Sequence, residues 1–225
     1  MDGTVNPRVA RLRASARDPG VCQVEIEGVG RFRIDARTVG ALGLAEGRHI
    51  APDAVARLAG AAERQRARAV ALGLLQRRLR SRAELEAALR RRGVPREEAL
   101  AVIGELARSG WIDDARFARA WIADRLTLRP SGARRLRAEL AARGVAPAVI
   151  AEALGAQLLP EQEEALALRQ AEDRLRRLQG FPPQAARRRL VGWLQRRGYS
   201  AGTIARTLRK VGPLSAGSPD DDPSD

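Results

Sequence analysis

Cysteine, histidine and aromatic residues are scarce in this chain. The single cysteine, Cys22, cannot form an internal disulfide, and with the single histidine, His49, it cannot complete a tetrahedral zinc site. Only 3% of the residues are aromatic, so the core must be built from Leu, Ala, Val and Ile, which favours helices. No apolar run reaches the length of a signal peptide or a membrane span. We therefore expect a cytoplasmic protein that does not enter a membrane.

Catalytic motifs are also lacking. The one lysine, Lys210, follows Arg209, so there is no phosphate-binding P-loop, and no G-x-S-x-G motif occurs. The adjacent carboxylates of Asp113 and Asp114 leave a metal-dependent nuclease as an alternative, but no further ligands lie near them in sequence. We predict no enzyme activity, no catalytic residue, no metal site and no cofactor.

What the chain does have is positive charge. It contains 41 basic and 27 acidic residues and has a formal charge of +14. Such an excess indicates a polyanionic partner, either nucleic acid or a protein that coats nucleic acid. The preference for arginine over lysine also arises from GC-rich coding, so the prediction depends on the net charge.

The first 60 residues predict a small α+β module behind a flexible N-terminus at residues 1–20. Cys22, Val24 and Ile26 alternate with polar residues, and after a glycine turn Phe32 and Ile34 do the same. This pattern predicts one β-hairpin, followed by short helical pieces at residues 38–44 and 52–58. The hairpin and helices form a module over residues 21–60. At the other end, residues 213–225 predict a disordered acidic tail.

Between these ends the sequence repeats three times. In each copy two leucines four positions apart are followed, four residues later, by a glycine at position 93, 144 or 198. Amphipathic segments lie before and after each of these stretches, so each copy predicts three helices. The repeats span residues 61–110, 111–159 and 160–212. The fold class is therefore mainly α, with three tandem three-helix repeats stacked into an elongated curved rod.

Helix-capping residues agree with this division. Asp113 is placed to cap a helix start, and Ser81 with Glu84 forms a capping box. Gly93, Gly144 and Gly198 stand where a left-handed C-terminal cap requires glycine. Phe117 and Trp121 lie four residues apart on one helix face, which predicts a packing role.

The arginines recur around the second helix of each repeat. Such a basic stripe would contact phosphates or acidic side chains without reading a base sequence, although a solvated helix face is the alternative for any single arginine. The candidate contact residues are Arg77, Arg78, Arg80, Arg82, Arg90, Arg91, Arg134, Arg135, Arg137, Arg187, Arg188, Arg189, Arg196 and Arg197.

Two segments resemble the RecX family, the bacterial regulators of RecA recombinase. The first is L-R-S-R-A-E-L at residues 79–85 with Leu89 and Gly93, and the second is G-W-I-D-D-A-R-F-A at residues 110–118 with Trp121, Arg125 and Gly132. The resemblance covers residues 61–211. It is weakest in the third repeat, where Ala186 replaces the Ser81 and Gly132 of the other copies.

The resemblance implies a non-enzymatic inhibitor that binds the RecA–DNA filament and limits filament extension, strand exchange and ATP hydrolysis. Separately from the resemblance, we expect a monomer with weak direct DNA binding. The alternative from the residues alone is a stand-alone basic nucleic-acid-binding protein of helix-turn-helix type.

Overall fold

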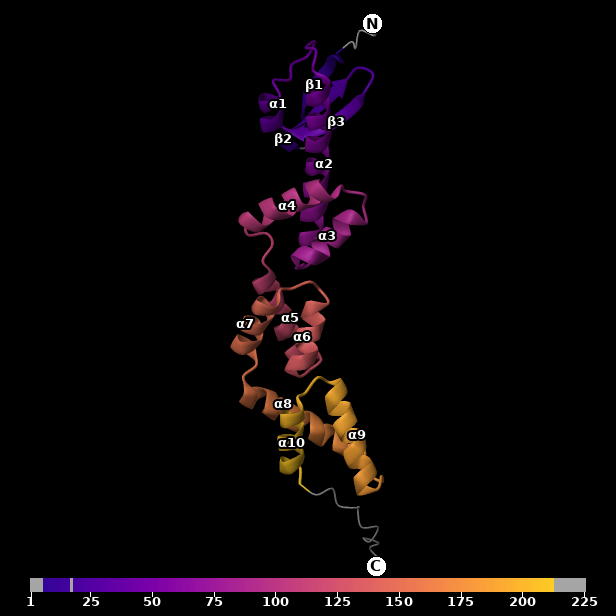
Figure 1. The fold of residues 1–225 in the computed structure, drawn as a ribbon, viewed down its shortest axis with the longest axis vertical. Coiled ribbons are helices and arrows are strands. Elements are labelled where there is room, and N and C mark those ends of the chain that lie inside the picture. The colour runs from indigo at the N-terminus through magenta and orange to yellow at the C-terminus, as the bar shows by residue number, and fades with distance from the viewer. Residues whose placement is uncertain (1–5, 17, 213–225) are drawn as a thin grey trace, which may run out of the picture. The chain divides into compact units, whose positions relative to one another are not determined.

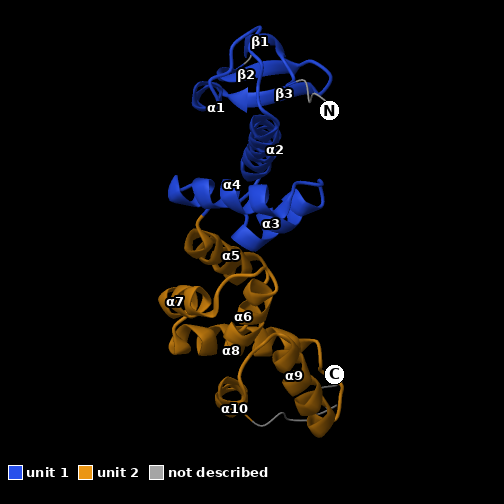
Figure 2. Cartoon of the chain, turned by 45° about the horizontal axis from the view of Figure 1, so that its top comes forward, with its two compact units in different colours: residues 1–112 blue, residues 113–225 orange. Residues whose placement is uncertain are grey.

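The computed structural model describes residues 6–16 and 18–212 (Figure 1). It divides into two compact units, residues 1–112 and 113–225, which are described separately (Figure 2). The acidic tail expected at residues 213–225 lies outside the described residues, as do the first five residues of the segment expected to be flexible.

The first unit begins with a three-stranded antiparallel sheet in the order β1-β2-β3. Strands β2 (Asp18–Ile26) and β3 (Gly30–Asp35) form the predicted hairpin, with Val24 opposite Phe32. Gly28 and Gly30 both have positive φ, at 72° and 140°, which explains why glycine occupies the turn.

The sequence prediction missed strand β1 (Val9–Ser15), which lies within the segment expected to be flexible. β1 pairs with β2, and a register shift between Val9 and Arg11 marks a bulge. Because of this bulge, the apolar positions of β1 do not follow a strict alternation of two. Pairing with the next strand along the chain, in which Ser15 lies opposite Asp18, therefore makes this segment a strand without an alternating apolar pattern.

Helix α1 (Ala36–Ala41) is followed by α2 (Pro52–Leu75), which connects the sheet to the first helical repeat. The first half of α2 packs Ala54, Leu58 and Ala61 against Val24, Ile26 and Ile34 of the sheet. Its second half contributes Ala67, Ala71 and Leu74 to a different core. The short helical piece predicted at residues 52–58 is thus the start of a continuous 24-residue helix. Because the middle of this helix is rich in alanine, its apolar and polar faces differ little, and the sequence pattern did not predict that the helix continues.

The first repeat is completed by α3 (Arg82–Arg90) and α4 (Arg96–Arg108). As predicted, Ser81 caps α3, its hydroxyl accepting a hydrogen bond from the Glu84 amide at 3.1 Å. Leu85, Leu89 and Leu106 are fully buried in the core of this repeat. Arg64 and Arg68 of α2 form ion pairs with Glu98 and Glu105 of α4, at 3.0 and 3.3 Å, at the margin of that core.

The second unit contains the other two repeats. The second repeat consists of α5 (Asp114–Leu128), α6 (Ala133–Ala141) and α7 (Pro147–Gln157). The third repeat consists of α8 (Pro160–Arg176), α9 (Pro183–Arg196) and α10 (Ala201–Lys210). Asp113 caps α5 as predicted, accepting hydrogen bonds from the amides of Ala115 and Arg116. Phe117 is buried, and its ring centroid lies 6.1 Å from that of Trp121.

All three predicted glycine caps are confirmed. Gly93, Gly144 and Gly198 have φ values of 72°, 73° and 88°. In each case the amide of the next residue donates to the carbonyl five positions earlier, as from Tyr199 to Leu194 at 3.2 Å. The mainly helical class with three three-helix repeats is therefore confirmed.

Candidate partner-binding surface

Hydrogen bonds join the start of α6, in the second repeat, to residues of the third repeat. The Gly132 amide donates to the Arg197 carbonyl at 2.9 Å, and the Arg134 amide donates to the Gly198 carbonyl at 3.1 Å. Between them, the Ala133 amide donates to Oε1 of Glu163 on α8 at 2.7 Å. The first amides of a helix have no partner within it and must find one elsewhere. Here the neighbouring repeat supplies the partners, so α6 is held firmly where its arginines begin.

A second cluster fixes α6 against α5, and Glu139 is its centre. The Trp121 indole nitrogen and Arg125 Nε both donate to Oε2 of Glu139, at 3.1 and 2.8 Å. Arg135 Nε donates to Oε1 at 3.0 Å. Glu139 is thus a shared acceptor for three side chains from two helices.

Arginine also covers the Trp121 ring. The guanidinium carbon of Arg143 lies 3.5 Å from the ring centroid and that of Arg125 lies 4.3 Å away, both within cation–π range. Burial disfavours the charged form of Glu139, but the hydrogen bonds from Arg125 and Arg135 outweigh it and lower the pKa of the Glu139 carboxyl. Trp121, Arg125 and Arg143 are therefore part of the scaffold.

Two of the candidate contact arginines take part in the same scaffold. Arg135 pairs with Glu139, and its Nη1 also donates to the Arg196 carbonyl at 3.3 Å. Arg197 donates to the Pro130 carbonyl at 3.3 Å and lies 4.8 Å from the Trp193 ring centroid. Both side chains link the second and third repeats, so both already have binding partners within the protein.

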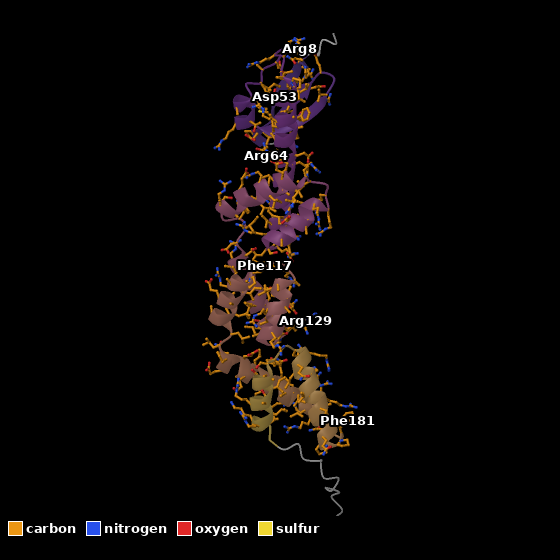
Figure 3. All side chains as sticks on the ribbon, viewed as in Figure 1. Arg8, Asp53, Arg64, Phe117, Arg129 and Phe181 are labelled. Atoms are coloured by element: carbon orange, nitrogen blue, oxygen red, sulfur yellow. The ribbon has the colours of Figure 1, made fainter. Side chains whose placement is uncertain are left out.

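Other arginines of α6 and α9 face solvent. Arg134 and Arg137 of α6 and Arg187 and Arg188 of α9 are exposed, and the side chain of each lacks a hydrogen bond or ion pair to the described part of the chain. Arg189 differs, because its guanidinium carbon lies 3.9 Å from the ring centroid of Phe181. Phe181 lies at the turn before α9 and is labelled in Figure 3. Helix α9 carries four arginines and no acidic residue. We call Arg134, Arg137, Arg187 and Arg188 the free arginine set.

In the first repeat the charges on the second helix itself balance, and further arginines lie on either side of that helix. Helix α3 has two arginines and two glutamates. Arg78 forms an ion pair with Glu84 at 2.8 Å, and Arg80 is half-buried, its pKa lowered by burial and by Arg78. Arg77, Arg90 and Arg91 are exposed, as is Arg82. Helices α6 and α9 thus carry a net positive charge on the helix itself, whereas the charges on α3 balance and other arginines of the first repeat flank it.

The paired aspartates lie at the start of α5, where Asp113 is the N-cap residue and Asp114 lies in the first turn. The Asp113 carboxylate caps α5, and the hydrogen bond from the Arg116 amide is the main cause of its lowered pKa. Across residues 6–16 and 18–212, no group of three or more His, Cys, Asp and Glu side chains is placed to hold a metal ion. Among the helices of residues 6–16 and 18–212, none is long enough and apolar enough to span a membrane.

Sequence reasoning missed Glu139, although one signal pointed to it. It is the single acidic residue in α6, which otherwise carries three arginines. An isolated carboxylate within a basic helix indicates a specific partner. The backbone contact between Gly132 and residues 197–198 gave no comparable signal, because it depends on two glycines far apart in the chain.

Three protein-family models match this chain. They are described as the first, second and third three-helix domains of RecX and match residues 67–106, 113–154 and 161–208. These ranges cover helices of all three repeats, including α6 and α9.

Curated relatives and solved structures agree with the family models. The Regulatory protein RecX of Thermobifida fusca is 45% identical over 145 residues, 64% of this chain and 78% of the relative. That of Amycolatopsis mediterranei is 37% identical over 155 residues, covering 67% and 88%. A crystal structure of regulatory protein RecX has a TM-score of 0.77 at 20% identity, covering 89% of this chain and 98% of that one, and supports the fold. The chain belongs to the RecX family of regulatory proteins.

Proposed function

We propose that this protein is a non-enzymatic regulator of RecA recombinase. In this role it binds the RecA–DNA filament in the cytoplasm and limits filament extension, strand exchange and ATP hydrolysis during recombination and repair. The observation that carries the proposal is the match of RecX family models to all three helical repeats. The name "regulatory protein" shared by the relatives and the lack of a catalytic motif in the sequence support a role without catalysis.

The free arginine set is our candidate for the contact face. A filament of protein and DNA presents phosphates and acidic side chains at regular intervals, and arginine forms bidentate hydrogen bonds with both groups. Within the described part of the chain, the side chains of Arg134, Arg137, Arg187 and Arg188 have no partner to give up on binding, in contrast to those of Arg135 and Arg197. Contact through these four side chains would thus leave the scaffold intact.

The direct test is the DNA-dependent ATPase of RecA, measured with and without substoichiometric amounts of this protein. We expect inhibition below one molecule per RecA, because one regulator that stops filament extension affects many later protomers. A protein that binds DNA tightly on its own and leaves the ATPase unchanged would instead be the stand-alone nucleic-acid-binding protein. Full ATPase activity at every ratio would contradict the proposal.

A further inference from the structure

The outer face of the N-terminal sheet carries two facing rows of arginine. Arg11 and Arg13 lie on β1, and Arg31 and Arg33 lie on β3. In the register of the sheet, Arg11 pairs with Glu25, which pairs with Arg31, and Arg13 pairs with Gln23, which pairs with Arg33. Directly paired residues of antiparallel strands project to the same side. All four arginines therefore lie on one face.

The opposite face of the sheet is already occupied. Val24, Ile26 and Ile34 are buried there against α2. The outer face borders a groove of about 440 Å³ that is lined by the four arginines, by Gln23 and Glu25, and by Val24 and Phe32. The groove is open to solvent, and six of its eight lining residues are polar or charged.

Most of this charge is not neutralised within the described part of the protein. Glu25 forms an ion pair with Arg31 at 3.2 Å and is the one acidic side chain among the described residues that line the groove. Arg11, Arg13 and Arg33 are exposed, and their side chains form no ion pair or hydrogen bond with the described residues. Three such guanidinium groups on one small sheet create a local positive potential that attracts an anion.

The spacing of the rows suits a polymer of regularly placed charges. Two residues along a strand are roughly 7 Å apart, and β1 and β3 are separated by roughly 10 Å, two inter-strand spacings. Guanidinium groups at such intervals can follow successive phosphates of one nucleic-acid strand. A partner protein usually needs an apolar anchor in a pocket, whereas the residues that project outward here are arginine, glutamine and glutamate.

We propose that this face of the sheet binds the phosphate backbone of nucleic acid without regard to sequence. The described residues that line the groove offer no exposed aromatic platform, since Phe32 packs with the core, so bases are not stacked on it. The inference does not rest on a role with RecA, because this sheet precedes the residues that the family models match. It assigns the N-terminal module a contact of its own.

The test uses the full-length protein and a fluorescent oligothymidylate of about 30 nucleotides, with RecA absent. The variant combines Arg11→Gln, Arg13→Gln and Arg33→Gln. We expect its affinity, measured by fluorescence anisotropy at low salt, to fall roughly tenfold or more. The slope of log K against log salt should decrease by about 2, since each lost phosphate contact on single strands accounts for roughly 0.7.

A matched control separates local contact from net charge. Arg37→Gln, Arg96→Gln and Arg209→Gln together remove the same three charges at exposed positions outside the groove. For this control, the slope of log K against log salt should stay close to the wild-type slope. A triple change of Arg11, Arg13 and Arg33 to lysine should also retain most of it, because lysine keeps the charge. Circular dichroism of each variant verifies that the sheet is folded.

Equal slopes for the glutamine variant and its control would overturn the proposal, as would a wild-type protein that does not bind the oligonucleotide. Binding of labelled poly-glutamate that depends on these arginines, with oligonucleotide binding that does not, would assign the face to an acidic protein and also overturn it. The RecA ATPase assay is scored separately, so failure of either proposal can be distinguished from failure of the other.

Discussion

Gly132 and Gly198 approach each other so closely that neither position has room for a side chain. A Cβ atom on Gly132 would lie 2.5 Å from the Gly198 carbonyl oxygen, and one on Gly198 would lie 2.3 Å from Cβ of Arg135. The two glycines belong to the second and third repeats, and backbone hydrogen bonds join the segments on either side. The contact is therefore a fixed joint between these two repeats.

This joint predicts that Gly198→Ala is much more destabilising than Gly93→Ala. Both glycines cap a helix with similar positive φ, 88° and 72°, so both substitutions incur the cost of about 1–2 kcal/mol for a left-handed alanine. A Cβ atom on Gly93 would meet no neighbouring atom of the described residues within 4 Å, whereas one on Gly198 meets the backbone of α6. We expect about 1–3 kcal/mol of additional loss at Gly198, measured by urea unfolding. Equal losses would show that the close contact is not maintained in solution.

The Glu139 cluster predicts a large effect from a nearly isosteric change. Glu139→Gln keeps the size of the side chain but removes the charge that Arg125 and Arg135 share. Because hydrogen bonds to charged groups contribute about 1.5–3 kcal/mol, we expect a loss of that order in the free energy of unfolding. Asp173→Asn is the control, since its ion pair with Arg176 is exposed and should contribute less than about 0.5 kcal/mol.

The same cluster predicts a dependence on pH. The folded-state pKa of Glu139 is lowered from its ordinary value of 4.5, so the folded protein favours the charged form. The resulting stabilisation is present above pH 4.5 and is lost as the pH falls through the lower folded-state pKa. The difference in unfolding free energy between wild type and Glu139→Gln should thus shrink as the pH is lowered from about 7 toward about 3. A difference that stays constant would contradict the assignment.

The free arginine set predicts which variants affect the filament. Arg134→Glu with Arg137→Glu should weaken binding to RecA–DNA filaments and reduce ATPase inhibition, while the melting temperature changes little. Arg116→Glu with Arg119→Glu is the control, because these residues are exposed on α5 with the same spacing and an equal charge change. Reversal at Arg135 is avoided because it would also break the contacts with Glu139 and the Arg196 carbonyl. Unchanged filament affinity in the first variant would remove α6 from the contact face.

Local physical chemistry in the sequence was enough to predict most of the helical architecture. Leucines at a spacing of four, the caps at Ser81 and Asp113, and the glycines that end α3 and α6 act over one or two helical turns. Their threefold recurrence indicated the repeats, and the sequence around Trp121 indicated the family. These features depend on near neighbours, so the order of residues alone determines them.

Only the tertiary structure decided which residues are available to a partner. The sequence treats Arg134 and Arg135 alike, but Arg135 contacts a carbonyl 61 positions away, whereas Arg134 is exposed and its side chain has no partner among the described residues. In the same way, pairing with β2 makes residues 9–15 a strand and places four arginines on one face of the sheet. Such roles depend on partners brought together by folding, and no local pattern in the sequence records them.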